Sequence, residues 1–560
     1  MHEPSLALHG EIPVSLREPV ADKLALAAHE RVPERLRAGD ATLWGPAGSE
    51  EIANRLGWLT IAERMLGEVE DLRAFADEVR DEGIRDVVLL GMGGSSLAPE
   101  VLRRCFAPRP QRPRLHVLDS TDSCAIRAVT HRIEPRRTLF LVSSKSGGTI
   151  EPLSLFAHFW SLVGEGQNFV AITDPGSGLA ALAGEHRFRR VFLGDPNIGG
   201  RYSALSPFGL VPGALIGLDL RALLAGAAEA WQTGVSEGTT GTSADLPGVG
   251  VADSAAVVLG ATLSALARAG RDKLTFLISA SLPGLGLWLE QLVAESTGKS
   301  HTGILPVAEE PPGDAEDYGE DRVFAYLPDR RDPDPTLEKL VRALAEAGHP
   351  AITIPTRGPS DLGRVFQLFE LAVAVAGWGL EINPFDQPNV QQAKDATKRV
   401  LDQYEARHEL TEAPDADAGA LSALLKAGPP SYVAIMGYVE PSGDFDAAVA
   451  ELRVTVRSAN TSPGRATTTF GYGPRFLHST GQFHKGGPKG GRFLQLLHDG
   501  PADVEIPGAP YTFTTLKNAE AIGDLQTLRE LGLPAERVRL RGEDCASALR
   551  ALTARIKETL

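Results

Sequence analysis

Short runs of apolar, often β-branched residues recur along the first half of the chain, and a helical stretch follows each run. The runs read DVVLLG, RLHVL, TLFLV, NFVAIT and RVFL. Continuous apolar runs of this length that alternate with helices are typical of parallel strands buried on both faces. The pattern therefore predicts one doubly wound α/β domain over residues 81–240.

A second alternating set, KLTFLIS, GILPVAE, RVFAYLP and AITIPTRG, predicts another doubly wound α/β domain over residues 250–410. Apolar residues spaced three and four apart predict a helical N-terminal segment over 1–80. Residues 425–560 open with SYVAIMGYVE and end with ASALRALTARIKETL, which predicts an additional C-terminal α/β unit. Segments rich in small and polar residues, at 233–250 and 412–430, are the predicted boundaries.

Composition leaves this picture unchanged but excludes several classes of protein. The 560 residues carry a net charge of −16, and an acidic surface repels both nucleic acids and anionic membranes. Cys105, Cys124 and Cys545 form neither a CxxC pair nor a zinc-ligand spacing. The sequence has no signal-peptide pattern and no apolar run long enough to span a bilayer. We therefore expect a cytoplasmic protein without nucleic-acid or membrane partners.

Two loops rich in glycine and serine directly follow predicted strands of the first domain. GMGGSS (91–96) follows VVLL, and SSKSGGT (143–149) follows TLFLV. Glycines let backbone N–H groups approach an anion, while hydroxyls and Lys145 supply the donors that a phosphate monoester needs. Because ligands bind at this edge of a parallel sheet, the loops predict a phosphate site. The alternatives are a plain tight turn, a serine-rich helix cap and a dinucleotide site, although the dinucleotide fingerprint requires glycine in place of Ser96.

Further segments add ionisable and amide side chains. Arg201 comes after a predicted strand, and in the sequence it is preceded by two glycines and followed by an aromatic residue. Gln291 and Glu295 share a helix face, and the negative end of the helix dipole tends to raise a carboxyl pKa, which suits a general base. A helix that starts directly after Gln387 would carry Lys394 two turns inside. A surface arginine, a solvated helix end and a solvated lysine are the corresponding structural alternatives.

In this order, the segments GxGGS, SSKSGGTIE, GGRYS, QxxxESxGK and FDQPxV…K resemble glucose-6-phosphate isomerases over about residues 85–400. GGRYS together with ESTGK is specific to that enzyme, whereas the serine-rich loop occurs throughout proteins with sugar-isomerase (SIS) domains. The resemblance implies that 81–240 and 250–410 are two SIS domains with doubly wound parallel sheets.

The resemblance also implies a role for each matching residue. Glu295 would be the base that moves a proton between C2 and C1, and Arg201 would stabilise the enediolate. Lys394 and a histidine would exchange protons with the ring oxygen and the anomeric hydroxyl. The candidate substrate-binding residues are Gly94, Ser95, Ser144, Lys145, Ser146, Thr149, Gln291 and Gln387.

The ring-opening histidine departs from the family order. The family places it between the base and the FDQ segment, where this chain has only His301 and His349 in other contexts. The matching FLHSTGQ appears later and points to His478, with His301 as the alternative. This order resembles the isomerase half of fused transaldolase–glucose-6-phosphate isomerases, but the chain is too short to hold the transaldolase barrel as well. If the segment folds back on its own chain, the site needs no partner subunit, and a monomer and a homodimer both remain open.

We therefore expect an isomerase that interconverts glucose 6-phosphate and fructose 6-phosphate in glycolysis and gluconeogenesis. The reaction combines ring opening with base-mediated C2–C1 proton transfer through a cis-enediolate, and it requires no metal or other cofactor. The alternatives are a SIS isomerase of another sugar phosphate and a non-catalytic phosphosugar-binding SIS regulator. A regulator would keep the serine-rich loop but could lose Glu295 and Arg201.

Overall fold

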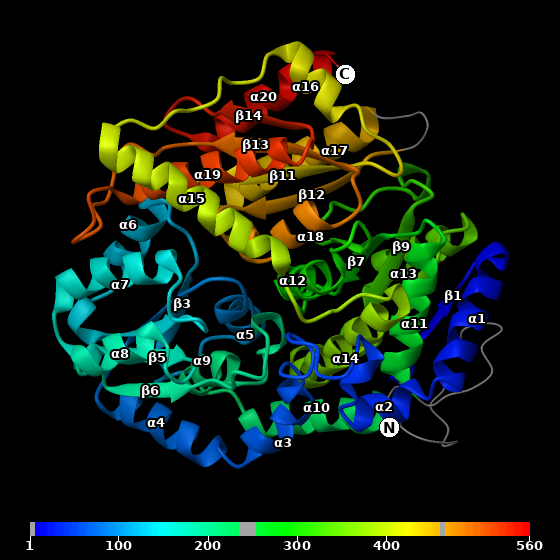
Figure 1. The fold of residues 1–560 in the computed structure, drawn as a ribbon, viewed down its shortest axis with the longest axis horizontal. Coiled ribbons are helices and arrows are strands. Elements are labelled where there is room, and N and C mark those ends of the chain that lie inside the picture. The colour runs from blue at the N-terminus through cyan, green and yellow to red at the C-terminus, as the bar shows by residue number, and fades with distance from the viewer. Residues whose placement is uncertain (1–5, 235–253, 460–464, 560) are drawn as a thin grey trace.

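Three sheets of parallel strands organise the part of the chain that the computed structural model describes, residues 6–234, 254–459 and 465–559 (Figure 1). In each sheet, the parallel strand that comes first in the sequence lies, in space, between two parallel strands that come later in the sequence. The chain therefore winds outward in opposite directions from that first strand. In open α/β sheets, ligands bind in the crevice at the carboxyl ends of the strands where this winding reverses.

The first sheet contains the five predicted strands, in the order β3-β2-β4-β5-β6. They are β2 (Asp86–Gly91), β3 (Arg114–Leu118), β4 (Thr138–Ser143), β5 (Phe169–Thr173) and β6 (Arg190–Leu193). Every residue of β2, β4 and β5 is buried, which explains their continuous apolar sequences. The helices of this region are α5 (Leu97–Cys105), α6 (Ser123–Arg132), α7 (Ile150–Val163), α8 (Gly178–Glu185), α9 (Pro207–Leu215) and α10 (Leu220–Gly234).

The second sheet has the order β8-β7-β9-β10 and gains an antiparallel edge strand, β1 (His9–Glu11), from the N-terminal segment. Its parallel strands are β7 (Lys273–Ile278), β8 (Leu305–Val307), β9 (Arg322–Leu327) and β10 (Ala351–Thr353). Its helices are α11 (Ala255–Arg268), α12 (Leu285–Thr297), α13 (Pro335–Glu346) and α14 (Leu362–Leu380). Every residue of α14 is buried, which accounts for its long apolar sequence. Among the described residues, no helix is both long and apolar enough to cross a membrane.

The third sheet, in the C-terminal part of the chain, repeats this winding with the order β12-β11-β13-β14. Its strands are β11 (Tyr432–Tyr438), β12 (Thr467–Tyr472), β13 (Gly491–Leu497) and β14 (Ala535–Arg539), and all are parallel. The helices are α16 (Ala418–Leu425), α17 (Gly443–Ala459), α18 (Gly481–Gly486), α19 (Phe513–Glu530) and α20 (Cys545–Thr559). The predicted α/β fold class is thereby confirmed for all three regions.

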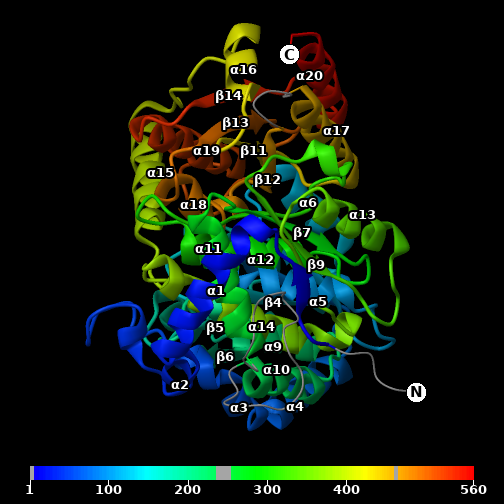
Figure 2. The same ribbon diagram turned by 90° about the vertical axis from the view of Figure 1, so that its right-hand side faces the viewer.

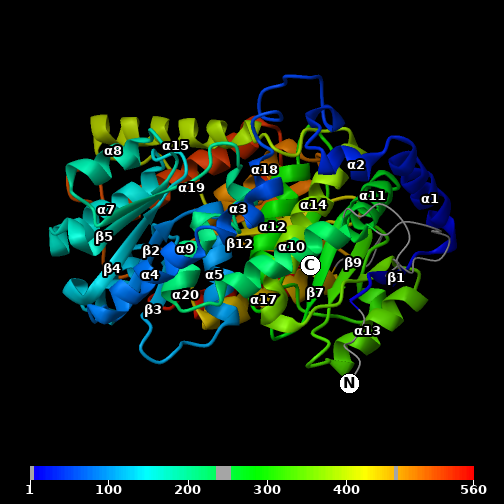
Figure 3. The same cartoon turned by 90° about the horizontal axis from the view of Figure 1, so that it is seen from below.

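Several helices pack across the predicted boundaries between these regions. The N-terminal helices are α1 (Val14–His29), α2 (Val32–Arg37), α3 (Ile61–Leu66) and α4 (Val69–Asp81). Helix α10 packs against α14 of the second sheet, and α1 packs against α11. Helix α15 (Pro388–Arg407) packs along α19 of the C-terminal region (Figures 1 and 3). The exact division of the chain into four units therefore stays a prediction.

Short 3-10 helices and loops complete the described chain. The 3-10 helices are η1 (Ala41–Leu43), η2 (Gly57–Thr60), η3 (Gly93–Ser95), η4 (Pro135–Arg137), η5 (Gly166–Asn168), η6 (Gly200–Tyr202), η7 (Ala315–Asp317), η8 (Gly358–Asp361) and η9 (Arg475–His478). Most of the predicted boundary at 233–250 lies outside the described residues. The predicted boundary at 412–430 contains α16.

Seen from the side, the C-terminal region lies above the other two sheets (Figure 2).

Candidate active site

Segments from all parts of the chain line one cavity of about 280 Å³. Eleven of the twelve predicted site residues line it: Gly94, Ser95, Ser144, Lys145, Ser146, Thr149, Gln291, Glu295, Gln387, Lys394 and His478. The twelfth, Arg201, lies against the wall and hydrogen-bonds to two of the lining residues. The structure thus brings together side chains that lie far apart in the sequence.

The glycine turn after β2 allows three segments to meet at the cavity. Gly93 has a φ of 54°, a left-handed conformation that favours glycine. A Cβ atom on Gly93 would lie 2.7 Å from the carbonyl oxygen of His478. A Cβ atom on Gly94 would lie 2.1 Å from the carbonyl oxygen of Gly200, at the start of η6. The turn therefore needs glycine for close backbone contact with η6 and η9.

Gly94→Ala is expected to destabilise the protein by about 1–3 kcal/mol, since an added methyl group in a packed contact forces the backbone apart. The shift would also displace the segment that carries Arg201. Chemical denaturation of wild type and variant measures the loss. Gly184→Ala, at a position with open space around the added carbon, is the matched control. Equal stability of Gly94→Ala and wild type would contradict the close contact.

The serine-rich loop after β4 presents hydroxyl groups and one ammonium group to the cavity. Ser144 Oγ donates to Thr149 Oγ1 at 3.1 Å, and the backbone N–H of Gly147 donates to Ser144 Oγ at 3.2 Å. Lys145 Nζ pairs with Asp174 at 2.5 Å and donates to the carbonyl oxygen of Asp195 at 2.8 Å. Burial lowers the pKa of Lys145 despite the ion pair with Asp174. The loop also leads into the N-terminus of α7, a favourable place for an anion.

Arg201 uses all of its guanidinium hydrogens within the wall of the cavity. Nε donates to Ser296 Oγ at 2.9 Å. Nη1 donates to Glu295 Oε2 at 3.3 Å and to Gln387 Oε1 at 3.1 Å. Nη2 donates to two backbone carbonyl groups in segment 384–386, at 2.7 and 2.8 Å. Because the side chain is buried and so constrained, its charge has a defined position beside Glu295.

Glu295 and Gln291 lie on the same face of α12, as the four-residue spacing predicts. Gln291 Nε2 lies 3.4 Å from Glu295 Oε1 and donates to the carbonyl oxygen of His478 at 2.8 Å. Burial raises the pKa of the Glu295 carboxyl, and Arg201 partly opposes this effect. The expected direction of the shift is correct. Its main cause is burial, whereas the prediction from the sequence rests on the helix dipole.

His478 reaches the cavity from η9, which follows β12. Its Nε2 atom lies 2.7 Å from Oε1 of Glu151, a buried carboxylate in the first turn of α7. Burial raises the pKa of Glu151, but the neighbouring His478 outweighs it, so that this pKa lies below its usual range. His301 is exposed, does not line the cavity, and its backbone N–H donates to the carbonyl oxygen of Gly486 at 2.9 Å. The geometry therefore favours His478 over His301.

Glu151 is not among the predicted site residues, although it belongs to the SSKSGGTIE segment. A carboxylate that accepts from a histidine ring fixes its tautomer and orientation, so Glu151 adds a positioning group to the site. The sequence feature that could have identified Glu151 is its position two residues after Thr149, in the first turn of α7, directly after the serine-rich loop.

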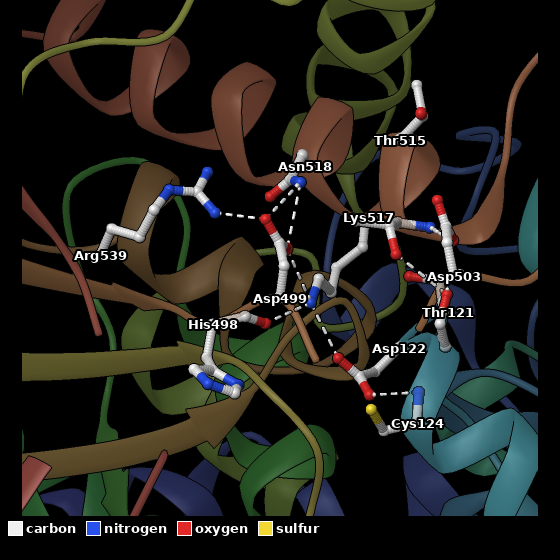
Figure 4. Close-up of polar contacts among 12 residues, drawn as sticks. Thr121, Asp122, Cys124, His498, Asp499, Asp503, Thr515, Lys517, Asn518 and Arg539 are labelled. Atoms are coloured by element: carbon white, nitrogen blue, oxygen red, sulfur yellow. Dashed lines mark hydrogen bonds and ion pairs between the residues drawn. The ribbon is translucent and has the colours of Figure 1, made fainter. Parts of the chain in front are cut away.

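Buried charges attach the C-terminal region, which carries His478, to the first sheet (Figure 4). Lys517 of α19 donates to Asp122 Oδ2 at 2.8 Å and to the carbonyl oxygen of His498 at 2.5 Å. Lys517 also lies 3.2 Å from Asp499, which pairs with Arg539. Asp122 caps the N-terminus of α6, next to β3. This network fixes the carboxyl end of β13 against the first region.

Two further basic residues near the cavity are also not among the predicted site residues. Arg55, in the N-terminal segment, lines the cavity, pairs with Glu51 at 2.5 Å and donates to the carbonyl oxygen of Pro196 at 3.1 Å. Lys299, the last residue of ESTGK, donates to the carbonyl oxygen and to Oδ1 of Asp386, both at 2.6 Å. Burial lowers the pKa of Lys299 to about 7. Lys299 thus supports the same backbone carbonyl that Arg201 contacts.

Comparisons with known proteins agree with this geometry. The family model for phosphoglucose isomerase matches residues 69–302. Glucose-6-phosphate isomerase from Rubrobacter xylanophilus is 30% identical over 421 residues, 66% of this chain and 92% of the relative. The enzyme of the same name from Thermus thermophilus is 30% identical over 428 residues, 67% of this chain and 96% of the relative.

Two solved structures share the fold. A hypothetical protein from Thermus thermophilus matches with a TM-score of 0.55 and 26% identity, over 70% of this chain and 99% of that one. A glucose-6-phosphate isomerase from Chlamydia trachomatis matches with a TM-score of 0.52 and 20% identity, over 70% and 86%. From the site geometry and the sequence relatives together, the chain belongs to the glucose-6-phosphate isomerase family of aldose–ketose isomerases, which act on sugar phosphates.

Proposed function

We propose that this enzyme interconverts glucose 6-phosphate and fructose 6-phosphate and serves glycolysis and gluconeogenesis. The observation that carries the proposal is the buried Glu295 carboxylate on the cavity wall, held between Arg201 and Gln291. A carboxylate with a raised pKa beside a fixed positive charge suits a base that removes a proton from carbon.

The phosphate group is assigned to the end of the cavity formed by the loop 143–149. Hydroxyl groups, the N-terminus of α7, Lys145 and Arg55 surround this end and supply donors for a dianion. Since phosphate lies far from the reacting carbons, its binding energy can hold C1 and C2 in place against Glu295. Ser95 and Gly94 complete this wall from the neighbouring strand end.

Ring opening is assigned to His478 and Lys394, which line the cavity together. The ring must gain a proton on its oxygen and lose one from the anomeric hydroxyl. Glu151 accepts a hydrogen bond from the imidazole and stabilises it when it carries a positive charge. The Lys394 ammonium group is the second proton-exchanging group.

In the open chain, Glu295 removes the C2 proton and returns it to C1. Negative charge then develops on the enediolate oxygens, next to the Arg201 guanidinium. A fixed hydrogen-bond donor at such a place stabilises the transition state by about 3–4 kcal/mol in other enzymes. Arg201 acts without rearrangement, because its hydrogen bonds already fix it.

All of these groups come from one chain, which supports a complete site in each molecule. The neighbouring sheets place His478 beside residues of the first two regions without any second copy. A phosphosugar-binding regulator explains the serine-rich loop. It does not explain a buried Glu295 and Arg201 held against each other.

Assaying the purified protein for conversion of fructose 6-phosphate to glucose 6-phosphate tests the proposal. In deuterated water, NMR should detect deuterium entering C1 of the ketose or C2 of the aldose, because Glu295 exchanges its proton with solvent between removal and return. Glucosamine 6-phosphate and arabinose 5-phosphate serve as comparison substrates. Faster turnover of either one would contradict the assignment of glucose 6-phosphate, and binding without turnover would favour the regulator.

Arg55→Ala is expected to raise KM for fructose 6-phosphate about ten- to a hundredfold, because a hydrogen bond to a charged group contributes about 1.5–3 kcal/mol. kcat should change much less, since Arg55 lies at the phosphate end. Initial-rate kinetics of variant and wild type measure both constants. Arg73→Ala, an exposed arginine of the same N-terminal segment that does not line the cavity, is the control. An unchanged KM would remove Arg55 from phosphate binding.

A further inference from the structure

A second cavity of about 390 Å³ adjoins the proposed active site. The two cavities share Thr149, Lys394 and His478 as lining residues. The second cavity extends from these residues between the start of α7, helix α15 and the residues in and before α19. None of the steps proposed for isomerisation uses this space.

The wall of the second cavity contains a buried acid without a full set of partners. Glu520 of α19 is only 2% exposed, and Thr121 Oγ1 donates to its Oε2 atom at 2.8 Å. Its Oε1 atom has no hydrogen-bond partner among the described residues. Burial, reinforced by Glu151, raises the pKa of the Glu520 carboxyl well above its usual range and thereby favours its protonated form. Since Oε2 accepts from Thr121, Oε1 is free to carry the acid proton.

An unsatisfied buried donor costs about 1–3 kcal/mol, and a ligand acceptor in the cavity removes that cost. Glu520 lines the cavity together with the Tyr511 side chain. These two residues are among the polar residues that line the cavity together with the apolar residues Ile150, Leu401 and Leu477. Apolar walls with a few polar groups are typical of small-molecule sites, and the volume falls within their usual range.

Helix α15 gives the second cavity a charge gradient. Lys394 and Lys398 are one turn apart and both line it. Asp402 and Glu405 line it further along the same helix. From Lys394 to Glu405, the helix rises about 16 Å, at 1.5 Å per residue. The two ammonium groups therefore lie at the end shared with the active site, where Glu151 also lines the cavity and pairs with His478. The acidic groups of α15 lie at the opposite end.

We propose that this cavity is a second ligand site, which binds a small organic anion with an apolar body. The anionic group lies at the Lys394–Lys398 end, and the apolar body packs against Leu401 and Leu477. Glu520 donates a hydrogen bond to an acceptor on the ligand. Because the ligand touches His478 and Lys394, its binding inhibits ring opening.

The test uses 3-phenylpropionate, a carboxylate with an apolar ring and no phosphate, titrated calorimetrically into the full-length protein. Wild type should bind one equivalent. Lys398→Glu should weaken binding at least about tenfold, since an attraction becomes a repulsion. Arg399→Glu makes the same charge change at the next residue, which is exposed and lines neither cavity, and should bind like wild type.

Glu520 supplies an independent pair of variants. Glu520→Gln keeps an N–H donor for the ligand and should bind 3-phenylpropionate like wild type. Glu520→Leu has no donor and should bind several-fold more weakly. If the buried leucine variant does not fold, the Lys398 and Arg399 pair decides the question.

Isomerase assays add a second readout. The probe should lower kcat in wild type and in Arg399→Glu, and it should have little effect on Lys398→Glu. Equal affinity of wild type, Arg399→Glu and Lys398→Glu for 3-phenylpropionate would overturn the proposal. The absence of any heat of binding at millimolar concentrations of this probe would also overturn it. Purely competitive inhibition that persists in Lys398→Glu would place the probe in the active cavity and would also overturn it. The calorimetric result holds whether or not the proposed substrate is correct.

Discussion

Glu295→Gln is expected to lower kcat by at least about 10²–10⁴-fold and to leave sugar-phosphate binding nearly unchanged. The amide has the size of the carboxyl group but cannot accept a proton from carbon. The amide oxygen can still accept from Arg201, so the buried guanidinium keeps its partner and the fold should be preserved, while the weak 3.4 Å contact with Gln291 is lost. Steady-state kinetics and calorimetric binding of fructose 6-phosphate measure the two effects separately.

Glu290→Gln is the matched control for this substitution. Glu290 lies on the same helix, is also buried and does not line the active cavity. Burial raises its pKa to about 8, so the carboxyl is mostly neutral at pH 7 and the amide is a close substitute. Near wild-type turnover in Glu295→Gln, or an equal loss in Glu290→Gln, would show that Glu295 is not the base.

The fold could be predicted well because its main signal is local. Strands such as β2 and β4 are buried on both faces, so their apolar runs stand out without any knowledge of their neighbours. The loops that follow them could be assigned to one edge, since parallel strands end on the same side of a sheet. Both loops do line the same cavity.

Pairings between distant residues could not be predicted in the same way. His478 and Glu151 are 327 positions apart, and only the docking of the C-terminal region on the first sheet brings them together. The raised pKa of Glu520 is also invisible in the sequence, because it results from burial and from the nearby Glu151. The position of helix α15 in the chain predicts that it belongs to the second domain, yet it packs on α19.

His478→Ala is expected to lower turnover of cyclic glucose 6-phosphate by about 10²-fold or more, since it removes a proton-transfer group. An open-chain aldose phosphate needs no ring opening. A tetrose 4-phosphate is such a substrate, because the phosphate occupies the oxygen that would close the ring. Exchange of its C2 proton with deuterated solvent depends on Glu295 and should fall by only a few-fold. NMR of both reactions gives the ratio of the two losses.

Glu151→Gln should show the same selectivity to a smaller extent, because Glu151 acts only through the imidazole. The amide can still hydrogen-bond to the ring nitrogen, but it no longer places a negative charge beside the imidazole. The rate on cyclic glucose 6-phosphate should therefore fall more than the rate of C2 proton exchange on the tetrose 4-phosphate. A purely structural role for Glu151 would lower both rates by the same factor.

His301→Ala separates the two histidines that the sequence leaves as candidates. The His301 side chain is exposed and outside the cavity, so this variant should match wild type on both substrates. If His301→Ala instead loses activity only on the cyclic sugar, ring opening belongs to His301. Equal losses of His478→Ala on cyclic and open-chain substrates would mean that His478 supports the whole site through its contacts with Gln291 and Glu151, without a role in ring opening.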